Sequence, residues 1–224
     1  MTKKITKWEP EDFELEMTTH WSFPKRGNWA THDAKWRGNW SPYIPRNIIL
    51  RYSQENDLIL DQFAGGGTTL VEAKLLNRAN GKVYLHKGDA RKLDFIPDES
   101  IDLVCTHPPY ANIIKYSEDI PEDLSLLKVQ DFLKEMEKVA TESFRVLKQG
   151  KFCAVLMGDT RQKGHMVPMS FEVMKIFQDA GFTLKELIIK EQHNCRATGY
   201  WKTNSVKYNF LLIAHEYLFV FHKI

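Results

Sequence analysis

The pattern of apolar and polar positions alternates between short apolar runs and longer segments with helical spacing. Short apolar runs that predict strands lie at 58–60, 82–86, 101–105, 151–157, 184–190, 210–215 and 218–222. Segments with apolar residues three and four positions apart, which predict amphipathic helices, lie at 45–52, 68–78, 129–147 and 169–180. In the second of these helices we expect Leu70, Val71, Leu75 and Leu76 to point inward. Strands that alternate with helices predict an α/β fold, a mostly parallel sheet with helices on both faces.

The strand at 101–105 runs into Thr106, His107, two prolines and Tyr110, a tyrosine that we expect to be exposed. Proline has no amide proton and restricts the residue before it, so the strand must stop abruptly. A rigid turn with an aromatic ring at the carboxyl end of a strand is where open α/β sheets bind ligands. An ordinary turn after a buried strand is the alternative, and a second motif upstream weakens it.

That second motif is DQFAGGGTT, residues 61–69, which follows the strand at 58–60. Successive glycines allow the backbone to approach a ligand closely, and the helix behind them offers amide donors and a positive dipole end. No lysine follows the last glycine and the spacing is not GxGxxG, so neither a phosphate loop nor a dinucleotide site is indicated. Alone, the string is also typical of an ordinary turn.

Composition limits the possible classes of protein. The 224 residues suit one α/β domain with a short extension, and the formal net charge of +2 means that a polyanion would be held by local patches. The three cysteines, Cys105, Cys153 and Cys195, show neither a disulfide framework nor zinc-site spacing, which indicates a reducing compartment inside the cell. The charged amino terminus and the lack of a long apolar run predict a soluble protein without a membrane span.

The stretch at 20–49 mixes tryptophans with basic residues. Its members are Trp21, Trp29, Trp36, Trp40, Lys25, Arg26, Lys35, Arg37 and Arg46. Such a mixture can stack on bases and pair with phosphates, and packing of the tryptophans in a small satellite core is the equal alternative.

The two motifs together resemble the paired signatures of the amino-methylating DNA methyltransferases, DPFxGSGTT followed by [DNS]PP[YFW]. The resemblance covers about residues 40 to 222 and implies a Rossmann-like class I methyltransferase sheet with an antiparallel carboxyl-terminal hairpin, binding S-adenosylmethionine. It implies a terminal extension at 1–40 and one catalytic domain at 41–224. The residues that it places around the cofactor are Asp61, Phe63, Ala64, Gly65, Gly67, Thr68 and Asp89, the last near the adenine.

The resemblance also implies the chemistry. An exocyclic amino group is a poor nucleophile because its lone pair is delocalised into the ring, and acceptors aimed at its protons localise that pair. His107 and the carbonyl of Pro108 would accept those protons, with Pro109 holding the turn and Tyr110 stacking on a base flipped out of double-stranded DNA. Methyl transfer would then depend mainly on positioning. A cytoplasmic enzyme of restriction-modification systems is implied, and a homodimer is one open oligomeric state.

His107 departs from the family, which has Asp, Asn or Ser at this position. Only a neutral imidazole can accept a hydrogen bond, so we expect turnover to fall as the pH drops through the pKa of His107, about 6.5 if unperturbed. An imidazole that merely caps the turn is the alternative. The wider string THPPYANIIKYS favours cytosine N4 over adenine N6 as the target.

The second departure is a missing strand. A Rossmann-like methyltransferase has a strand after the first helix that ends in an acid for the ribose of the cofactor. Here LLNRAN runs directly into GKVYLHKGDAR, so we expect a further segment between Asn80 and Gly81 in the complete protein.

Other functions and the basis of specificity stay open. An RNA guanine-N2 methyltransferase and a catalytically silent nucleic-acid-binding relative are the competing interpretations. Candidate nucleic-acid contacts in the polar stretch at 191–207 are Arg196, Tyr200, Trp201 and Lys202, and the pair His193 and Cys195 is too small for a metal site.

Overall fold

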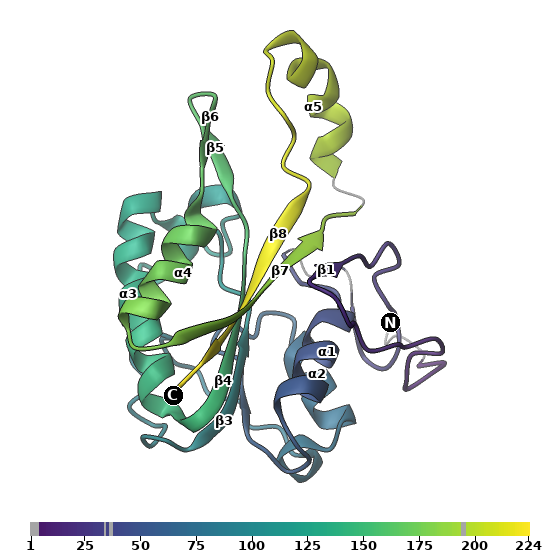
Figure 1. Cartoon of the computed structure of the whole chain (residues 1–224), viewed down its shortest axis with the longest axis vertical. Helices are drawn as coiled ribbons and strands as arrows, with labels where there is room; N and C mark the ends of the chain where they lie inside the picture. The colour runs from purple at the N-terminus through teal and green to yellow at the C-terminus, as the bar shows by residue number, and fades with distance from the viewer. Residues whose placement is uncertain (1–4, 34, 36–37, 194–195) are drawn as a thin grey trace.

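A six-stranded sheet forms the centre of the computed structural model, which describes residues 5–33, 35, 38–193 and 196–224 (Figure 1). Its order is β1-β7-β8-β4-β3-β2. The strands are β1 (His20–Trp21), β2 (Ile59–Leu60), β3 (Ile101–Thr106), β4 (Leu147–Met157), β7 (Thr183–Glu191) and β8 (His215–His222). Strand β8 is antiparallel to both β4 and β7, and the other pairs are parallel. The predicted α/β class, mostly parallel with antiparallel strands at the end of the chain, is confirmed.

Helices cover both faces of the sheet (Figure 1). They are α1 (Tyr43–Tyr52), α2 (Thr68–Leu75), α3 (Val129–Val146), α4 (Met169–Asp179) and α5 (Arg196–Lys207), with short 3₁₀ turns η1 (Arg78–Gly81), η2 (Ala111–Ile113) and η3 (Leu124–Leu126). Side chains of β3 alternate between two cores: Leu103 and Cys105 pack with α1 and the amino-terminal segment, and Val104 packs with α3 and α4. This two-sided burial is why β3 reads as a continuous apolar run.

The predicted strand at 82–86 is wrong. The backbone turns through left-handed conformations at Asn77, Ala79 and Asn80, with φ of 55°, 49° and 53°, so the chain leaves η1 without aligning beside β2. Residues 82–88 are exposed and pair with no strand among the described residues, which leaves β2 at the edge of the sheet. Asn80 and Gly81 are consecutive in η1, and a further segment between them stays a prediction.

Other differences lie after β4. The segment 158–168, for which the sequence predicts no strand, contains a hairpin of β5 (Thr160–Gln162) and β6 (His165–Val167), and the polar stretch after β7 contains α5. The predicted strand at 210–215 is irregular, and only its last residue, His215, belongs to β8. Periodicity missed α5 because its sequence, RATGYWKTNSVK, has no regular apolar spacing.

The predicted inward face of α2 is mostly wrong. Its buried residues are Thr68, Thr69, Glu72 and Ala73, and of the four predicted residues Leu76 alone packs against a core of the sheet. Glu72 is fully buried because Trp29 Nε1, His32 Nε2 and an Arg46 guanidinium nitrogen lie 2.7, 2.6 and 2.9 Å from its carboxylate. These polar partners compensate the burial of the charge, so a carboxylate replaces leucine on the inner face.

Three tryptophans of the amino-terminal stretch pack in the interior. Trp21, Trp29 and Trp40 are at most 5% exposed, and β1 joins the sheet beside β7. The three tryptophans are therefore packing residues, but Trp21 and Trp40 join the core on the α1 face of the sheet and not a separate satellite core. Trp36 and Arg37 lie outside the described residues. The split into 1–40 and 41–224 stays a prediction.

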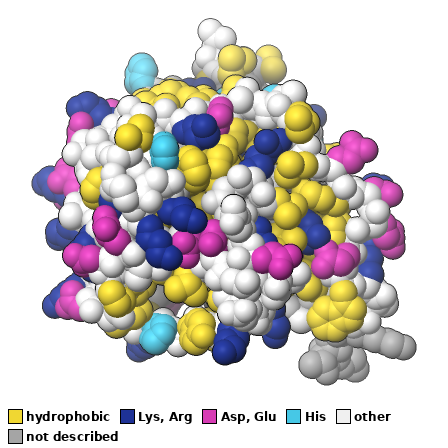
Figure 2. Space-filling model, turned by 60° about the horizontal axis from the view of Figure 1, so that its bottom comes forward, with side chains coloured by type: hydrophobic (Ala, Val, Ile, Leu, Met, Phe, Trp, Pro, Cys, Tyr) yellow, Lys and Arg dark blue, Asp and Glu magenta, His cyan; other side chains and the backbone are white. Residues whose placement is uncertain are grey.

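The surface carries mixed charge. Figure 2 shows the end of the molecule away from α5, where basic and acidic side chains are interspersed with exposed hydrophobic ones. A polyanion would find no broad basic field on this face. Among the described helices, none has the length and apolar character that a membrane crossing requires.

Candidate active site

The carboxyl ends of three parallel strands bring the two sequence motifs together. Asp61 follows β2, His107 follows β3 and Gly158 follows β4. Neighbouring parallel strands end at the same edge of a sheet, so residues far apart in the sequence meet there. Glu216, at the start of antiparallel β8, lies at the same edge, opposite Lys190 of β7.

Asp61 links the glycine-rich turn to β3. One carboxylate oxygen accepts from Thr106 Oγ1 at 2.7 Å and from the Phe63 amide at 3.0 Å, and the other accepts from Thr69 Oγ1 at 2.5 Å. Burial raises the pKa of Asp61, and these three donors oppose that shift. Gly67, at φ of 76°, turns the chain into α2. The motif is therefore held by its own residues Phe63 and Thr69 and by Thr106 of β3.

The glycine-rich turn borders a cavity of about 410 Å³, here called the glycine-turn cavity. Its lining residues are Gly38, Asn39, Trp40, Asp61, Gln62, Phe63, Ala64, Gly65, Gly66, Gly88, Asp89, Ala90, His107, Pro109, Tyr116, Ile120, Glu122, Asp123 and Leu124. Four of them are carboxylic acids, and no lysine or arginine is among these described lining residues. Gly67 and Thr68, predicted for the same site, do not line it; Thr68 hydrogen-bonds to Asn39.

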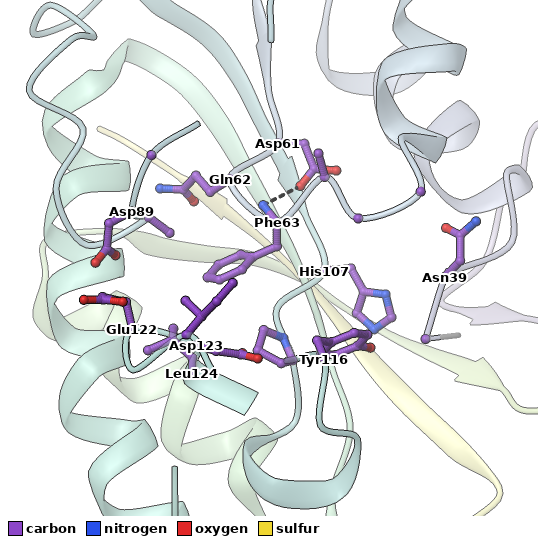
Figure 3. Close-up of a pocket in the computed structure, with 18 of the residues that line it drawn as sticks. Asn39, Asp61, Gln62, Phe63, Asp89, His107, Tyr116, Glu122, Asp123 and Leu124 are labelled. Carbon is purple, nitrogen blue, oxygen red and sulfur yellow. Dashed lines mark hydrogen bonds between the residues drawn. The ribbon is translucent and has the colours of Figure 1, made fainter. Parts of the chain in front are cut away.

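The two ends of the glycine-turn cavity differ. Figure 3 shows the carboxylates of Asp89 and Glu122 at one end, His107 and Asn39 at the other, and the ring of Phe63 between them. Arg91 donates to both oxygens of Asp89, with its closest contact at 2.6 Å, and lowers the pKa of that carboxyl. Asp89 is therefore ionised and fixed in orientation at physiological pH.

The Pro-Pro-Tyr turn borders a second cavity of about 440 Å³, here called the Tyr110 cavity. Its lining residues are Phe23, Pro24, Arg26, Gly38, Asn39, Trp40, Ser41, His107, Pro108, Pro109, Tyr110, Ile113, Ile114, Tyr116, Lys190, Glu191, Gln192, His193 and Glu216. His107 and Pro109 line both cavities, so the two spaces adjoin at the turn. Trp40 stacks on the imidazole of His107, with ring centroids 5.4 Å apart and planes at 24°.

Tyr110 is half-buried rather than exposed as predicted, because its hydroxyl has partners on two sides. It lies 2.7 Å from His107 Nε2 and donates to Glu216 Oε1 at 2.8 Å. Lys190 donates to the other oxygen of Glu216 at 2.8 Å. A row of hydrogen bonds thus connects the motif of β3 with an ion pair between β7 and β8.

Burial and charge set the protonation of this row. Burial lowers the pKa of His107 to about 4, with Lys190 and Arg26 adding to the shift and Glu216 opposing it. Burial would raise the pKa of Glu216, but the attraction of Lys190 holds it below its ordinary value. His107 is therefore neutral at pH 7, and the unperturbed pKa assumed from the sequence does not apply.

Gly158 makes room for the ring of Tyr110. A Cβ atom at this position would lie 2.6 Å from Cε2 of Tyr110, closer than van der Waals contact allows. The residue that follows β4 must therefore be glycine if Tyr110 is to reach Glu216.

Three of the predicted nucleic-acid residues, Tyr200, Trp201 and Lys202, line neither cavity. Arg196, Tyr200, Trp201 and Lys202 belong to α5, which projects from the same end of the sheet (Figure 1). Tyr200 is 74% and Trp201 44% exposed. Cys195 lies outside the described residues. Side chains that sequence reasoning missed at the site are Asn39, Gln62, Tyr116, Glu122, Lys190 and Glu216.

The chain is similar to known methyltransferases in sequence and in fold. The Type II methyltransferase M.MjaVI of Methanocaldococcus jannaschii is 29% identical over 155 residues, 69% of this chain and 77% of that protein. The structure of TrmN from Thermus thermophilus has a TM-score of 0.54 at 17% identity, covering 85% of this chain and 51% of that one, and shows the same fold. TTHA0409 of Thermus thermophilus, solved in complex with S-adenosyl-L-methionine, is 26% identical with a TM-score of 0.45, covering 62% of this chain and 54% of that one.

The family model described as DNA methylase matches residues 2–96 and 101–224. The match includes both motifs and the amino-terminal stretch that precedes them. With a model that spans nearly all of its length, this chain belongs to the family of DNA methylases that modify N4 or N6 amino groups.

Proposed function

We propose that this protein transfers a methyl group from S-adenosylmethionine to the exocyclic amino group of a base flipped out of double-stranded DNA, and that cytosine N4 is preferred over adenine N6. One observation carries the proposal. A cavity whose described lining includes four carboxylic acids and neither lysine nor arginine adjoins an aromatic cavity at His107 and Pro109. A cationic donor and a planar acceptor would therefore meet at the Pro-Pro-Tyr turn.

The glycine-turn cavity fits the methyl donor of this family. Its volume of about 410 Å³ lies in the range of small-molecule sites, roughly 300–1,000 Å³. The carboxylates suit a ligand with an ammonium and a sulfonium, and a lining without lysine or arginine disfavours a phosphate. Phe63 and Leu124 offer apolar surface to a purine ring, and Asp89 and Glu122 offer acceptors beside it.

When bound, S-adenosylmethionine supplies a methyl group already activated by its sulfonium charge. The chain supplies acceptors for the two protons of the target amino group: the neutral imidazole of His107 and the carbonyl of Pro108. Both groups are fixed, since proline restricts the backbone and Trp40 packs on the imidazole. Fixed acceptors localise the nitrogen lone pair without reorganisation during the reaction.

The Tyr110 cavity would hold the target base. Trp40, Tyr110 and Tyr116 give it aromatic walls, and a base inside a duplex must leave the stack to reach such a pocket. The helix α5 and its return to β8 would contact the DNA around it, through the exposed rings of Tyr200 and Trp201 and through Lys202. Arg161 of β5 donates to the carbonyl of Leu211 at 2.8 Å and so connects the hairpin β5–β6 to the segment between α5 and β8.

Isotope transfer tests the proposal. The protein is incubated with methyl-labelled S-adenosylmethionine and either unmethylated genomic DNA or transfer RNA, and nucleosides from each digest are separated by mass spectrometry. We expect label in N4-methylcytosine from DNA, with His107→Ala as the inactive control. Label in N6-methyladenine would correct the target base. Label in guanine of transfer RNA alone, or no label with DNA binding intact, would overturn the proposed reaction.

A further inference from the structure

Three strands contribute to a continuous row of polar side chains at the edge of the Tyr110 cavity. His107 Nε2 lies 2.7 Å from the hydroxyl of Tyr110, which donates to Glu216 at 2.8 Å. Glu216 accepts from Lys190 at 2.8 Å, its direct register partner across β7 and β8. The Glu216 and Lys190 side chains are 10% and 15% exposed. A buried ion pair thus ends a hydrogen-bond row that begins at the proposed catalytic histidine.

The hydrogen-bonding roles in this row follow from the groups themselves. An ionised carboxylate can only accept, so the proton of the Tyr110 hydroxyl points to Glu216. The Tyr110 oxygen can then only accept from His107, which requires a proton on Nε2. A neutral imidazole protonated at Nε2 has a bare lone pair on Nδ1. Among the described residues, no hydrogen bond engages Nδ1 of His107.

We propose that Glu216, oriented by Lys190, is a positioning residue that acts through Tyr110 to hold His107 in its Nε2–H tautomer and so keeps Nδ1 as the acceptor. The effect of this tautomer on methyl transfer rests on the proposed function. The tautomer itself can be measured on the protein alone. The proposal accounts for histidine where the resembling enzymes have Asp, Asn or Ser. Those side chains always present an acceptor, but a histidine does so only in a defined tautomer.

Glu216→Gln is the decisive variant, because Lys190 dictates how the new amide lies. The ammonium of Lys190 needs an acceptor, so the amide oxygen turns to Lys190 and the amide nitrogen turns to Tyr110. Tyr110 then accepts from the amide and donates to Nε2 of His107. The tautomer of His107 is thereby reversed, and Nδ1 carries the proton.

Nitrogen-15 NMR of the histidine-labelled protein reads the tautomer, because protonated and bare ring nitrogens have well-separated shifts. The chain has 8 histidines, and the loss of signals in His107→Asn assigns His107. We expect a bare Nδ1 in the wild type and a protonated Nδ1 in Glu216→Gln. Methyl transfer by Glu216→Gln should fall about tenfold, which corresponds to a barrier raised by about 1.4 kcal/mol when one acceptor is lost. The dissociation constant of S-adenosylmethionine should stay unchanged.

Two further variants separate positioning from packing. Adding Lys190→Met to Glu216→Gln frees the amide to turn its oxygen to Tyr110, which should restore the Nε2–H signal and part of the rate. Asp102→Asn removes a buried partner of Lys148 and Lys151 on β3, away from the cavities. It should lower the melting temperature as an ion-pair loss does and leave the tautomer and the transfer rate unchanged.

Once His107 is assigned, the wild-type spectrum alone tests the proposed tautomer, even if Glu216→Gln folds poorly. A proton on Nδ1 of His107 in the wild type would overturn the proposal, and so would an unchanged tautomer in folded Glu216→Gln. Tyr110→Phe gives an independent reading, since His107 should then lose its preference and show both tautomers. A reversed tautomer with an undiminished transfer rate would keep the assignment and overturn the catalytic role of His107.

Discussion

The two cavities that adjoin at His107 are built in different ways. The glycine-turn cavity takes much of its wall from one continuous motif, in which Asp61 is tied to Phe63 and Thr69 of the same turn. The Tyr110 cavity takes its polar wall from separate strands, in which Tyr110, Lys190 and Glu216 meet only after folding. The first cavity contains a locally built motif, whereas the polar wall of the second depends on strand register.

This difference has a chemical counterpart. The glycine-turn cavity presents carboxylates and suits a cation, whereas the Tyr110 cavity presents aromatic rings and a neutral imidazole beside an internally compensated ion pair. Damage to the first should change donor affinity, and damage to the second should change the transfer step. The predictions below test that separation.

The largest effect is expected from His107→Ala. It removes one of the two acceptors for the target amino group, and loss of one preorganised hydrogen-bonding group at a reacting centre costs about two orders of magnitude in rate. Single-turnover methyl transfer to DNA measures the rate, and calorimetry should show an unchanged affinity for S-adenosylmethionine. His107→Asn, which keeps an acceptor, should recover part of the rate. Full activity of His107→Ala would break the separation between the cavities.

Asp61→Ala should act on the other cavity. It leaves the hydroxyls of Thr69 and Thr106 and the amide of Phe63 without their common acceptor, at about 1–3 kcal/mol for each group that stays buried and unpaired. We expect the dissociation constant of S-adenosylmethionine to rise about tenfold or more and the free energy of unfolding to fall by at least about 2 kcal/mol. Calorimetry and urea denaturation measure the two effects.

Asp61→Asn is the matched control, since it keeps one acceptor oxygen and should lie between the wild type and Asp61→Ala in both measurements. Wild-type donor affinity in Asp61→Ala would mean that the glycine-rich turn holds its shape without Asp61. The proposed local construction of this cavity would then be wrong.

The same difference explains what the sequence could predict. Helix α3 and strand β3 were found because their apolar residues follow a strong period, and both motifs were found because their residues are contiguous. Glu216 and Lys190 were missed because only the antiparallel register of β7 and β8 makes them neighbours. The inward face of α2 was predicted wrongly because the partners of Glu72 come from the distant amino-terminal stretch and α1.

The protonation of His107 also lay beyond sequence reasoning. Its type and place after β3 were readable, but its pKa depends on burial and on Lys190 and Arg26, which come from other parts of the fold. The predicted strand at 82–86 failed for a related reason. An apolar run becomes a strand only where a neighbour can pair with it, and η1 directs the chain away from β2.

Gly158→Ala should have an intermediate effect, confined to the Tyr110 cavity. The new methyl group would lie 2.6 Å from the ring of Tyr110. The side-chain and backbone shifts that such overpacking forces typically cost about 1–3 kcal/mol of stability. Tyr110 should then move away from Glu216, and the transfer rate should fall about tenfold. A tenfold fall corresponds to about 1.4 kcal/mol, which lies within the range given for overpacking. Donor affinity should stay as in the wild type, and a rise in the dissociation constant comparable to that of Asp61→Ala would contradict the separation.

The smallest effect on rate is expected from pH. With the pKa of His107 lowered to about 4, the imidazole stays an acceptor, and the contribution of His107 to methyl transfer should be constant from pH 8 to about 5.5. Stability should respond instead. Unfolded His107 binds a proton near pH 6.5 and folded His107 only near pH 4, so the unfolded state binds more protons between these values. The free energy of unfolding must therefore fall as the pH drops through that window.

His107→Ala isolates this contribution, because all other titrating groups are common to both proteins. The difference in unfolding free energy between wild type and variant, measured by urea denaturation at pH 7.5 and pH 5, should shrink on acidification. A transfer rate that falls through pH 6.5 without such a change would mean that His107 is solvated and not held in the buried row. That outcome would separate His107 from Tyr110 and Glu216, and the Tyr110 cavity would then lack the dependence on strand register that distinguishes it from the glycine-turn cavity.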